Sequence, residues 1–171
     1  MKVRVAAPLT YDSIVDGPGL RMVLWTQGCV HRCKGCHNPQ THDPLGGFEL
    51  DCNDIIHQMR NAKLQKGITF SGGDPFLQPK ALLSIAIEAR KLGLDVWAYS
   101  GYRWEELINK NNPNYEDNLL LLREIDVLVD GRFIEKQKSI ELLFRGSANQ
   151  RIIDVQQSLK SLDVVLVPRY M

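Results

Sequence analysis

The chain has 171 residues, of which 44% are hydrophobic and 24% are charged, and this composition predicts one globular domain over residues 1–171. Its 21 Lys and Arg residues against 20 Asp and Glu residues leave a net charge of +1, which argues against a protein dedicated to nucleic acid or to an anionic membrane surface. No apolar run reaches the ~18 residues of a membrane span, and the first residues lack the apolar stretch of a signal peptide, so we expect a cytoplasmic protein.

Runs rich in apolar and β-branched residues alternate with helical periods along the chain. The predicted strands cover residues 22–27, 68–71, 95–100, 125–130, 151–154 and 164–167. Two longer helices are predicted from apolar faces with helical spacing, one over residues 51–61 and one that ends near Gly93. Shorter helices over residues 103–110 and 119–123 flank a loop. This alternation predicts an α/β fold with a mainly parallel sheet, compatible with a partial (β/α) barrel.

Three of the four cysteines stand in the loop after the first of these strands, as Cys29, Cys33 and Cys36. Three thiolates on one short loop can surround a single metal centre, whereas a structural zinc site needs four ligands, and His37 is poorly placed to supply the fourth. Cys52 lies on the apolar face of a predicted helix, and we interpret it as a small buried hydrophobic residue. The pattern favours a four-iron cluster with one iron left open, and a zinc-binding or redox module is the alternative.

A second motif follows the next predicted strand, where residues 69–75 read Thr-Phe-Ser-Gly-Gly-Asp-Pro. The adjacent Gly72 and Gly73 allow the backbone to approach a ligand closely, although a plain turn is the alternative. Ligand sites in α/β folds lie at the carboxyl ends of the strands, so we expect the two motifs to share one site.

Together the two motifs resemble the radical S-adenosylmethionine (SAM) superfamily. The resemblance implies a partial (β/α) barrel of minimal size, in which Cys29, Cys33 and Cys36 hold one [4Fe-4S] cluster per chain. It further implies that the amino and carboxylate groups of SAM chelate the open iron. Gly72-Gly73-Asp74 is similar to the Gly-Gly-Glu element of the superfamily, which hydrogen-bonds the SAM ammonium, with a shorter Asp in place of Glu.

Other features resemble one subgroup, the activating enzymes of anaerobic (class III) ribonucleotide reductase. Gly35 precedes the third cysteine, where the superfamily usually has an aromatic residue, and residues 14–19, 127–133 and 145–151 also resemble the subgroup. The resemblance covers residues 12–155 and implies cofactor contacts from Gly35, Cys36, His37, Gly72, Gly73, Asp74, Asp130 and Arg132. For Asp130 and Arg132 a surface ion pair is the alternative, and residues 145–151 either line the cofactor mouth or cap the last strands.

The subgroup implies an activity. The reduced cluster would pass one electron to SAM, and the resulting 5′-deoxyadenosyl radical would remove a hydrogen atom from a glycine in the large subunit of the reductase. A low-potential donor such as flavodoxin would supply the electron, and we expect no general acid–base pair. The basic run of His31, Arg32, Lys34 and His37 is either a solvated loop or a surface that attracts an acidic partner. The alternatives are activation of a different glycyl-radical enzyme and another small radical SAM reaction.

Overall fold

The computed structural model describes residues 1–170. Its strands are β1 (Lys2–Val5), β2 (Thr10–Ser13), β3 (Arg21–Thr26), β4 (Phe48–Asp51), β5 (Gly67–Gly72), β6 (Asp95–Tyr99), β7 (Val127–Asp130) and β8 (Arg151–Asp154). Its α-helices are α1 (Cys52–Asn61), α2 (Pro79–Lys91), α3 (Trp104–Leu107), α4 (Tyr115–Leu122) and α5 (Val155–Ser161). Short 3-10 helices lie at Pro39–Thr41, Pro75–Leu77, Glu135–Gln137 and Pro168–Tyr170.

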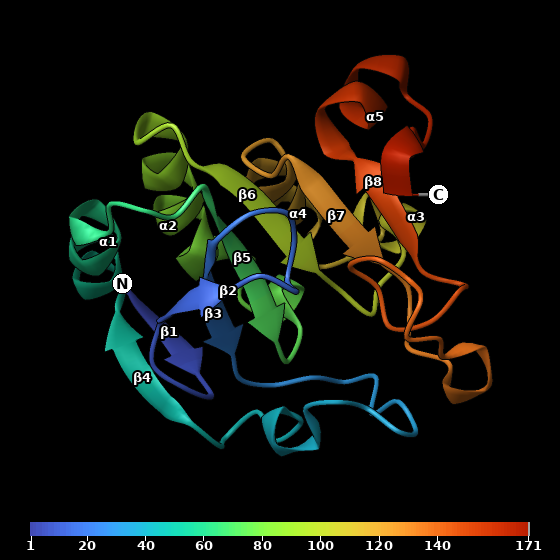
Figure 1. Ribbon diagram of the computed structural model, residues 1–171, viewed down its shortest axis with the longest axis horizontal. Helices are drawn as coiled ribbons and strands as arrows, with labels where there is room; N and C mark the ends of the chain where they lie inside the picture. Colours follow the sequence, from blue (N-terminus) through green and yellow to red (C-terminus); the bar gives the residue numbers. More distant parts are fainter. Residues whose placement is uncertain (171) are drawn as a thin grey trace.

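The strands form one mixed sheet in the order β4-β1-β3-β5-β6-β7-β8, with β2 paired to β3 (Figure 1). The central strands β3, β5, β6 and β7 are parallel, whereas β1, β2, β4 and β8 each pair in antiparallel fashion. The α/β class and the parallel centre are confirmed. The prediction of a mainly parallel sheet holds for the centre only, because the flanking strands are joined to it by antiparallel pairs.

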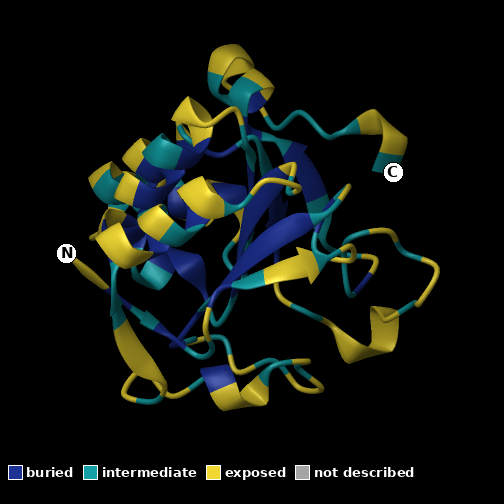
Figure 2. Ribbon diagram, turned by 60° about the vertical axis from the view of Figure 1, so that its left-hand side comes forward, coloured by how far each residue is buried: buried dark blue, intermediate teal, exposed yellow. Residues whose placement is uncertain are grey.

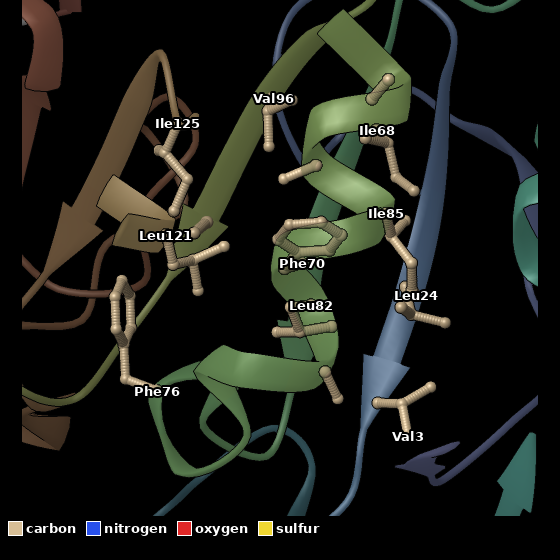
Figure 3. Packing of buried hydrophobic residues seen from close by; sticks show 14 of the residues in the cluster. Val3, Leu24, Ile68, Phe70, Phe76, Leu82, Ile85, Val96, Leu121 and Ile125 are labelled. Carbon is tan, nitrogen blue, oxygen red and sulfur yellow. The ribbon is translucent and has the colours of Figure 1, made fainter. Parts of the chain in front are cut away.

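The main hydrophobic core lies between the sheet and helices α1, α2 and α4. Ile68 and Phe70 from β5 face Leu82 and Ile85 from α2, and all four side chains are fully buried (Figure 3). In Figure 2 the sheet beneath the helices is buried, while the outer faces of the helices are exposed. Burial of each such side chain contributes about 1.5–3 kcal/mol to folding, so this layer fixes the strands whose ends carry the functional loops.

The opposite face of the sheet has a smaller core. Trp97 alternates with Val96 and Ala98 along β6, so its ring lies on this second face and packs against Phe144 and Tyr170 at centroid distances of 5.6 and 5.9 Å. A fully buried arginine, Arg21, begins β3 on the same face. Its guanidinium pairs with Asp95 and lies 5.5 Å from the centre of the Trp97 ring. These contacts compensate for the loss of water around the buried charge.

Helix α1 matches its predicted range within one residue, and helix α2 ends where its sequence predicts. The Asp51 side chain caps α1 by accepting a hydrogen bond from the Asn53 N–H, and Cys52, Ile55 and Met59 are buried. Helix α2 ends before Gly93, which has a φ of +74° and donates its N–H to Arg90.

Several elements differ from the sequence prediction. Residues 164–167 do not form a strand and join the sheet through a single bridge between Leu166 and Ile153. The sequence did not predict β1, β2, β4 or α5, because these segments are short and none of the four carries a continuous apolar run. Within residues 1–170, no helix combines the length and the hydropathy that a membrane crossing demands.

Candidate functional site

A cavity of about 570 Å³ opens where the parallel strands end. It is lined by Gly72 and Gly73 from the end of β5, Ser100 and Gly101 after β6, and Gly131 after β7. The loop after β3 and the long loop after β7 both extend beyond the arrowheads of these strands (Figure 1). This volume is within the range of about 300–1,000 Å³ that is usual for small-molecule sites.

The three clustered cysteines lie on the loop after β3, and all three line this cavity. Cys29, Cys33 and Cys36 are free and partly exposed, and the Cys36 N–H donates to the Cys33 carbonyl at 3.2 Å. Three residues of the loop have left-handed backbone, Gly28 at a φ of +101°, Arg32 at +47° and Gly35 at +73°. The left-handed conformation explains a glycine before the third cysteine, because a side chain there would be strained.

The donor set suits a cluster better than a single ion. No group of three or more His, Cys, Asp or Glu side chains within residues 1–170 could hold one metal ion. In a four-iron cluster each thiolate binds a different iron, so the three sulfurs surround the cluster and do not meet at one point. Three thiols that line one cavity without converging on an ion therefore fit a [4Fe-4S] cluster.

The Cys29 thiol is partly buried beside the cavity. Partial burial raises the pKa of the Cys29 thiol, while hydrogen bonds from the backbone of His31 and Arg32 act against the rise. Metal binding requires the thiolate and releases the proton. Cys52 is not one of these candidate ligands. It is 3% exposed, and its thiol donates to the Ala81 carbonyl, so the prediction of a small buried residue is confirmed.

The two glycines after β5 let the chain pack closely on itself. A Cβ on Gly73 would lie 2.2 Å from the carbonyl oxygen of Gly28, the residue before Cys29. The Gly73 N–H donates to Thr26 at 2.7 Å, and the Asp74 N–H donates to Gly28 at 2.8 Å. The glycine motif and the cysteine loop are thus in direct backbone contact, beside the same cavity.

The polar residues predicted to contact a cofactor have three different placements. His37 lines the cavity, and its ring lies 5.1 Å from that of Phe133. Asp74 is fully buried behind the cavity wall. Asp130 is 1% exposed and accepts hydrogen bonds from the Trp104 N–H at 2.8 Å and from Arg151. Asp130 joins β7 to β8 through its ion pair with Arg151, and it caps α3 by accepting from the Trp104 N–H.

The remaining residues of that prediction lie on the surface. Arg132 is exposed, and its carbonyl accepts a hydrogen bond from Asn149 at 2.8 Å. Gly35 is exposed, beside Glu135. His31 differs from the expectation for the basic run. Only 1% of its side chain is exposed, so the reading of the whole run as a solvated loop is wrong at this residue.

Part of the cavity wall was not anticipated from the sequence. The apolar residues Ile14 and Val15 line one side of the mouth, and Ile140, Leu143 and Phe144 line another. Burial raises the pKa of Tyr99, whose hydroxyl donates to the Phe144 carbonyl at 2.8 Å and holds the loop after β7. Isolated apolar residues in loops carry no periodic pattern, so only their position around the cavity reveals them.

The segment 145–151 both lines the cavity and caps the last strands, the two roles that the sequence left open. Arg145, Gly146 and Gln150 line the cavity. The Gln150 side chain accepts hydrogen bonds from the backbone of Gly146 and Ser147 and donates to the Gly131 carbonyl at 2.9 Å. Arg151, by contrast, caps the sheet through Asp130.

Comparison with known proteins identifies relatives over most of the chain. Residues 15–153 match the family model described as a 4Fe-4S single cluster domain. Proteins named anaerobic ribonucleoside-triphosphate reductase-activating protein are 36% identical in Vibrio cholerae over 148 residues and 37% identical in Escherichia coli K12 over 146 residues. These matches cover 81% and 80% of this chain and 90% of each relative. The protein of the same name from phage T4 is 33% identical, and the match covers 84% of this chain and 93% of that relative.

A solved structure is similar in fold. The crystal structure of QueE from Escherichia coli superimposes with a TM-score of 0.51 over 59% of this chain and 53% of that chain, at 15% sequence identity. At this identity the likeness concerns the fold alone.

Proposed function

This chain belongs to the family of anaerobic ribonucleoside-triphosphate reductase-activating proteins and carries its 4Fe-4S single cluster domain, and from that premise we propose that it is a glycyl-radical activase. When bound, a reduced [4Fe-4S] cluster and SAM supply the radical chemistry that removes a hydrogen atom from a glycine of the reductase. The protein contributes binding, orientation and exclusion of water. The observation that carries the proposal is the set of three thiols beside a strand-end cavity of about 570 Å³.

Cys29, Cys33 and Cys36 are the cluster ligands in this proposal. They supply three thiolates, which leaves one iron for SAM. Gly72 and Gly73 expose backbone along the cavity, where a cofactor ammonium can approach it. Cys36 and His37 line the same wall, so we assign both a cofactor contact. Gly35 is assigned the same role because it directly precedes Cys36.

The acidic residues have supporting roles in this proposal. Asp74 and Asp130 are buried and already accept several hydrogen bonds, which supports a role in holding the strand ends in place. Arg132 stays a candidate cation at the cavity mouth, because it is exposed next to Phe133, which lines the cavity. One SAM-dependent domain, with its open sheet as a partial (β/α) barrel, accounts for the whole chain.

The mouth of the cavity supports a protein substrate. Ile14, Val15 and Ile140 are 69%, 71% and 96% exposed around it, which leaves the reacting centre open to a large partner. That partner is the large subunit of the anaerobic reductase, as the names of the relatives suggest. The electron comes from a low-potential donor such as flavodoxin, in the cytoplasm, with no nucleic acid or membrane involved.

The proposal is tested by anaerobic reconstitution with iron and sulfide, followed by reduction and addition of SAM. The wild-type protein should bind one cluster and release 5′-deoxyadenosine. Cys33→Ala should lose both, because it removes one of three ligands. Cys52→Ala is the matched control. It should keep its iron and its SAM cleavage and lose only a packing contribution of about 1 kcal/mol.

Two results would contradict the proposal. Iron loss in Cys52→Ala with retention in Cys33→Ala would overturn the ligand assignment. A wild-type protein that binds zinc stably, acquires no iron–sulfur chromophore and leaves SAM intact would favour the zinc-binding module instead.

A further inference from the structure

His31 lies in the interior of the cysteine loop, between Cys29 and Cys33, and its side chain is turned into the protein. Its Nε2 is 2.9 Å from Asp74 Oδ2, and the exposed fractions of the two side chains are 1% and 0%. The bond therefore connects the cluster loop to the residue that follows the glycines of β5, in a place that water does not reach.

Asp74 is fully engaged by groups that donate to it. Its carboxylate accepts from the Phe76 N–H at 3.0 Å, the Gly101 N–H at 2.9 Å and the Ser100 hydroxyl at 2.9 Å. Ser100 Oγ in turn accepts from the Tyr102 N–H, so its own proton points to Asp74. Because all these partners donate, Nε2 of His31 acts as a fourth donor. These hydrogen bonds hold the Asp74 carboxylate in one position, next to the ends of both β5 and β6.

The imidazole ring is also held by packing. It meets Tyr102 edge to face, with ring centroids 4.4 Å apart. On the side of Gly101 the fit is tighter, because a Cβ there would lie 2.2 Å from His31 Cδ2. Side-chain contacts between the rest of the loop and the body of the protein are weaker. Among residues 1–170 they include the exposed ion pair between Lys34 and Glu135 at 3.5 Å and the tilted ring contact of His37.

We propose that His31 is a positioning residue, which locks the cysteine loop through Asp74 to the ends of β5 and β6. This lock, the contact of His31 with Asp74, holds the cluster ligands at a set position relative to the Gly72-Gly73 backbone. That the loop carries cluster ligands rests on the proposed function. The lock also gives a reason for a short carboxylate at position 74, since the imidazole occupies the space beside it.

The lock can be tested on the cluster-free protein, where no activity is needed. We compare His31→Gln, whose amide nitrogen can replace Nε2 as donor, with His31→Leu, which fills space but cannot donate. The readout is the rate at which a maleimide labels Cys29, Cys33 and Cys36, resolved by peptide mass spectrometry. His31→Leu should be labelled about tenfold faster than wild type, because a buried hydrogen bond to a carboxylate is lost, and His31→Gln should stay near wild type. Lys34→Gln, which removes only the exposed ion pair, is the matched control and should also stay near wild type.

Cys52 reports on folding in the same experiment, because it is buried in the main core. If His31→Leu unfolds and Cys52 is labelled, Gly101→Ala tests the lock in its place. Its methyl group displaces the imidazole from the other side while His31 is kept. Wild-type labelling rates in a folded His31→Leu protein, or in Gly101→Ala, would overturn the lock. Failure of wild-type SAM cleavage would instead overturn the proposed function and leave the labelling result standing.

After reconstitution, the same variants separate positioning from binding. His31→Leu should lower the turnover of SAM more than it raises the KM for SAM, because misplacement of the loop affects the reacting geometry first. His31→Gln should restore turnover. A change in KM alone, or no rescue by Gln, would contradict the positioning role.

Discussion

Gly73 is the residue at which the two sequence motifs meet. Its position beside the Gly28 carbonyl shows that the close approach inferred from the Gly-Gly pair takes place within the protein itself. The sequence identified the glycines, but it could not identify the neighbouring chain, because that contact joins segments 45 residues apart through the pairing of β3 and β5.

Gly73→Ala should therefore disturb the cluster loop as well as the cofactor cavity. The new Cβ would lie 2.2 Å from one backbone atom and 2.8 Å from another of Gly28, and neither can move without moving Cys29. We expect less iron per chain after reconstitution and weaker SAM binding. Gly131→Ala separates this clash from backbone strain, because Gly131 has a φ of +97° but its nearest neighbours to a Cβ are 3.9 Å away. Full iron content in Gly73→Ala, or an equal loss in Gly131→Ala, would refute the contact as the cause.

His31 marks the limit of residue-scale prediction. In the sequence it stands among Arg32, Lys34 and His37, and a run of basic residues usually forms a solvated face. Its burial depends on Asp74 and Gly101, which lie in the loops after β5 and β6, and no local pattern encodes that contact.

At the scale of elements, one ion-pair network joins the ends of β7, β8 and α3. Arg151 in β8 contacts Asp130 in β7 and both carboxylate oxygens of Glu105 in α3, at 3.0 and 2.9 Å. The hydrogen bond from the Trp104 N–H to Asp130 caps the start of α3. This network accounts for the burial of Asp130 without a bound cofactor.

Arg151→Met should destabilise the protein by about 3–5 kcal/mol, because it leaves the buried Asp130 carboxylate without its cation. Arg151 also holds the pKa of Glu105 below its usual value. That contribution is present above the usual pKa of Glu105 and is lost as the pH falls through the lowered pKa. Chemical denaturation of the cluster-free protein at neutral and acidic pH measures both effects. Arg103→Met, which removes an exposed pair with Glu105 at 3.7 Å, should cost less than about 1 kcal/mol, and an equal loss in the two variants would contradict the account.

Elements with strong periodicity were predicted well, whereas β1, β2 and β4, on one side of the sheet, were not. Helix α1 and the central strands follow from apolar spacing, because both are packed against the main core. Strand β4 pairs only with β1 at the edge of the sheet, and two of its four residues are exposed. Its four residues alternate apolar and polar, but the segment is too short to be distinguished from a loop. Residues 164–167 have the opposite character. They are rich in valine and pack against the two hydrophobic cores, yet they pair with the sheet through a single bridge.

At the scale of the whole molecule, the helices that stabilise the sheet lie apart from the loops that form the candidate site. Helices cover one face of the sheet, and the cysteine loop, the glycine motif and the loop after β7 meet at the carboxyl ends of its parallel strands (Figure 1). The cavity mouth is open and lined by exposed apolar residues. The net charge of the whole chain is only +1. The topology was predictable as α/β because strands and helices alternate, whereas the antiparallel flanks depend on pairings across the sheet that alternation does not specify.

In the proposed function, this chain places a radical on a glycine of the anaerobic reductase. The most direct measurement is the electron paramagnetic resonance spectrum of the reconstituted, reduced protein mixed anaerobically with SAM and the reductase. We expect a glycyl-type doublet on the reductase that requires SAM and disappears with Cys33→Ala. SAM cleavage without that doublet, together with a doublet on a different glycyl-radical enzyme, would contradict it.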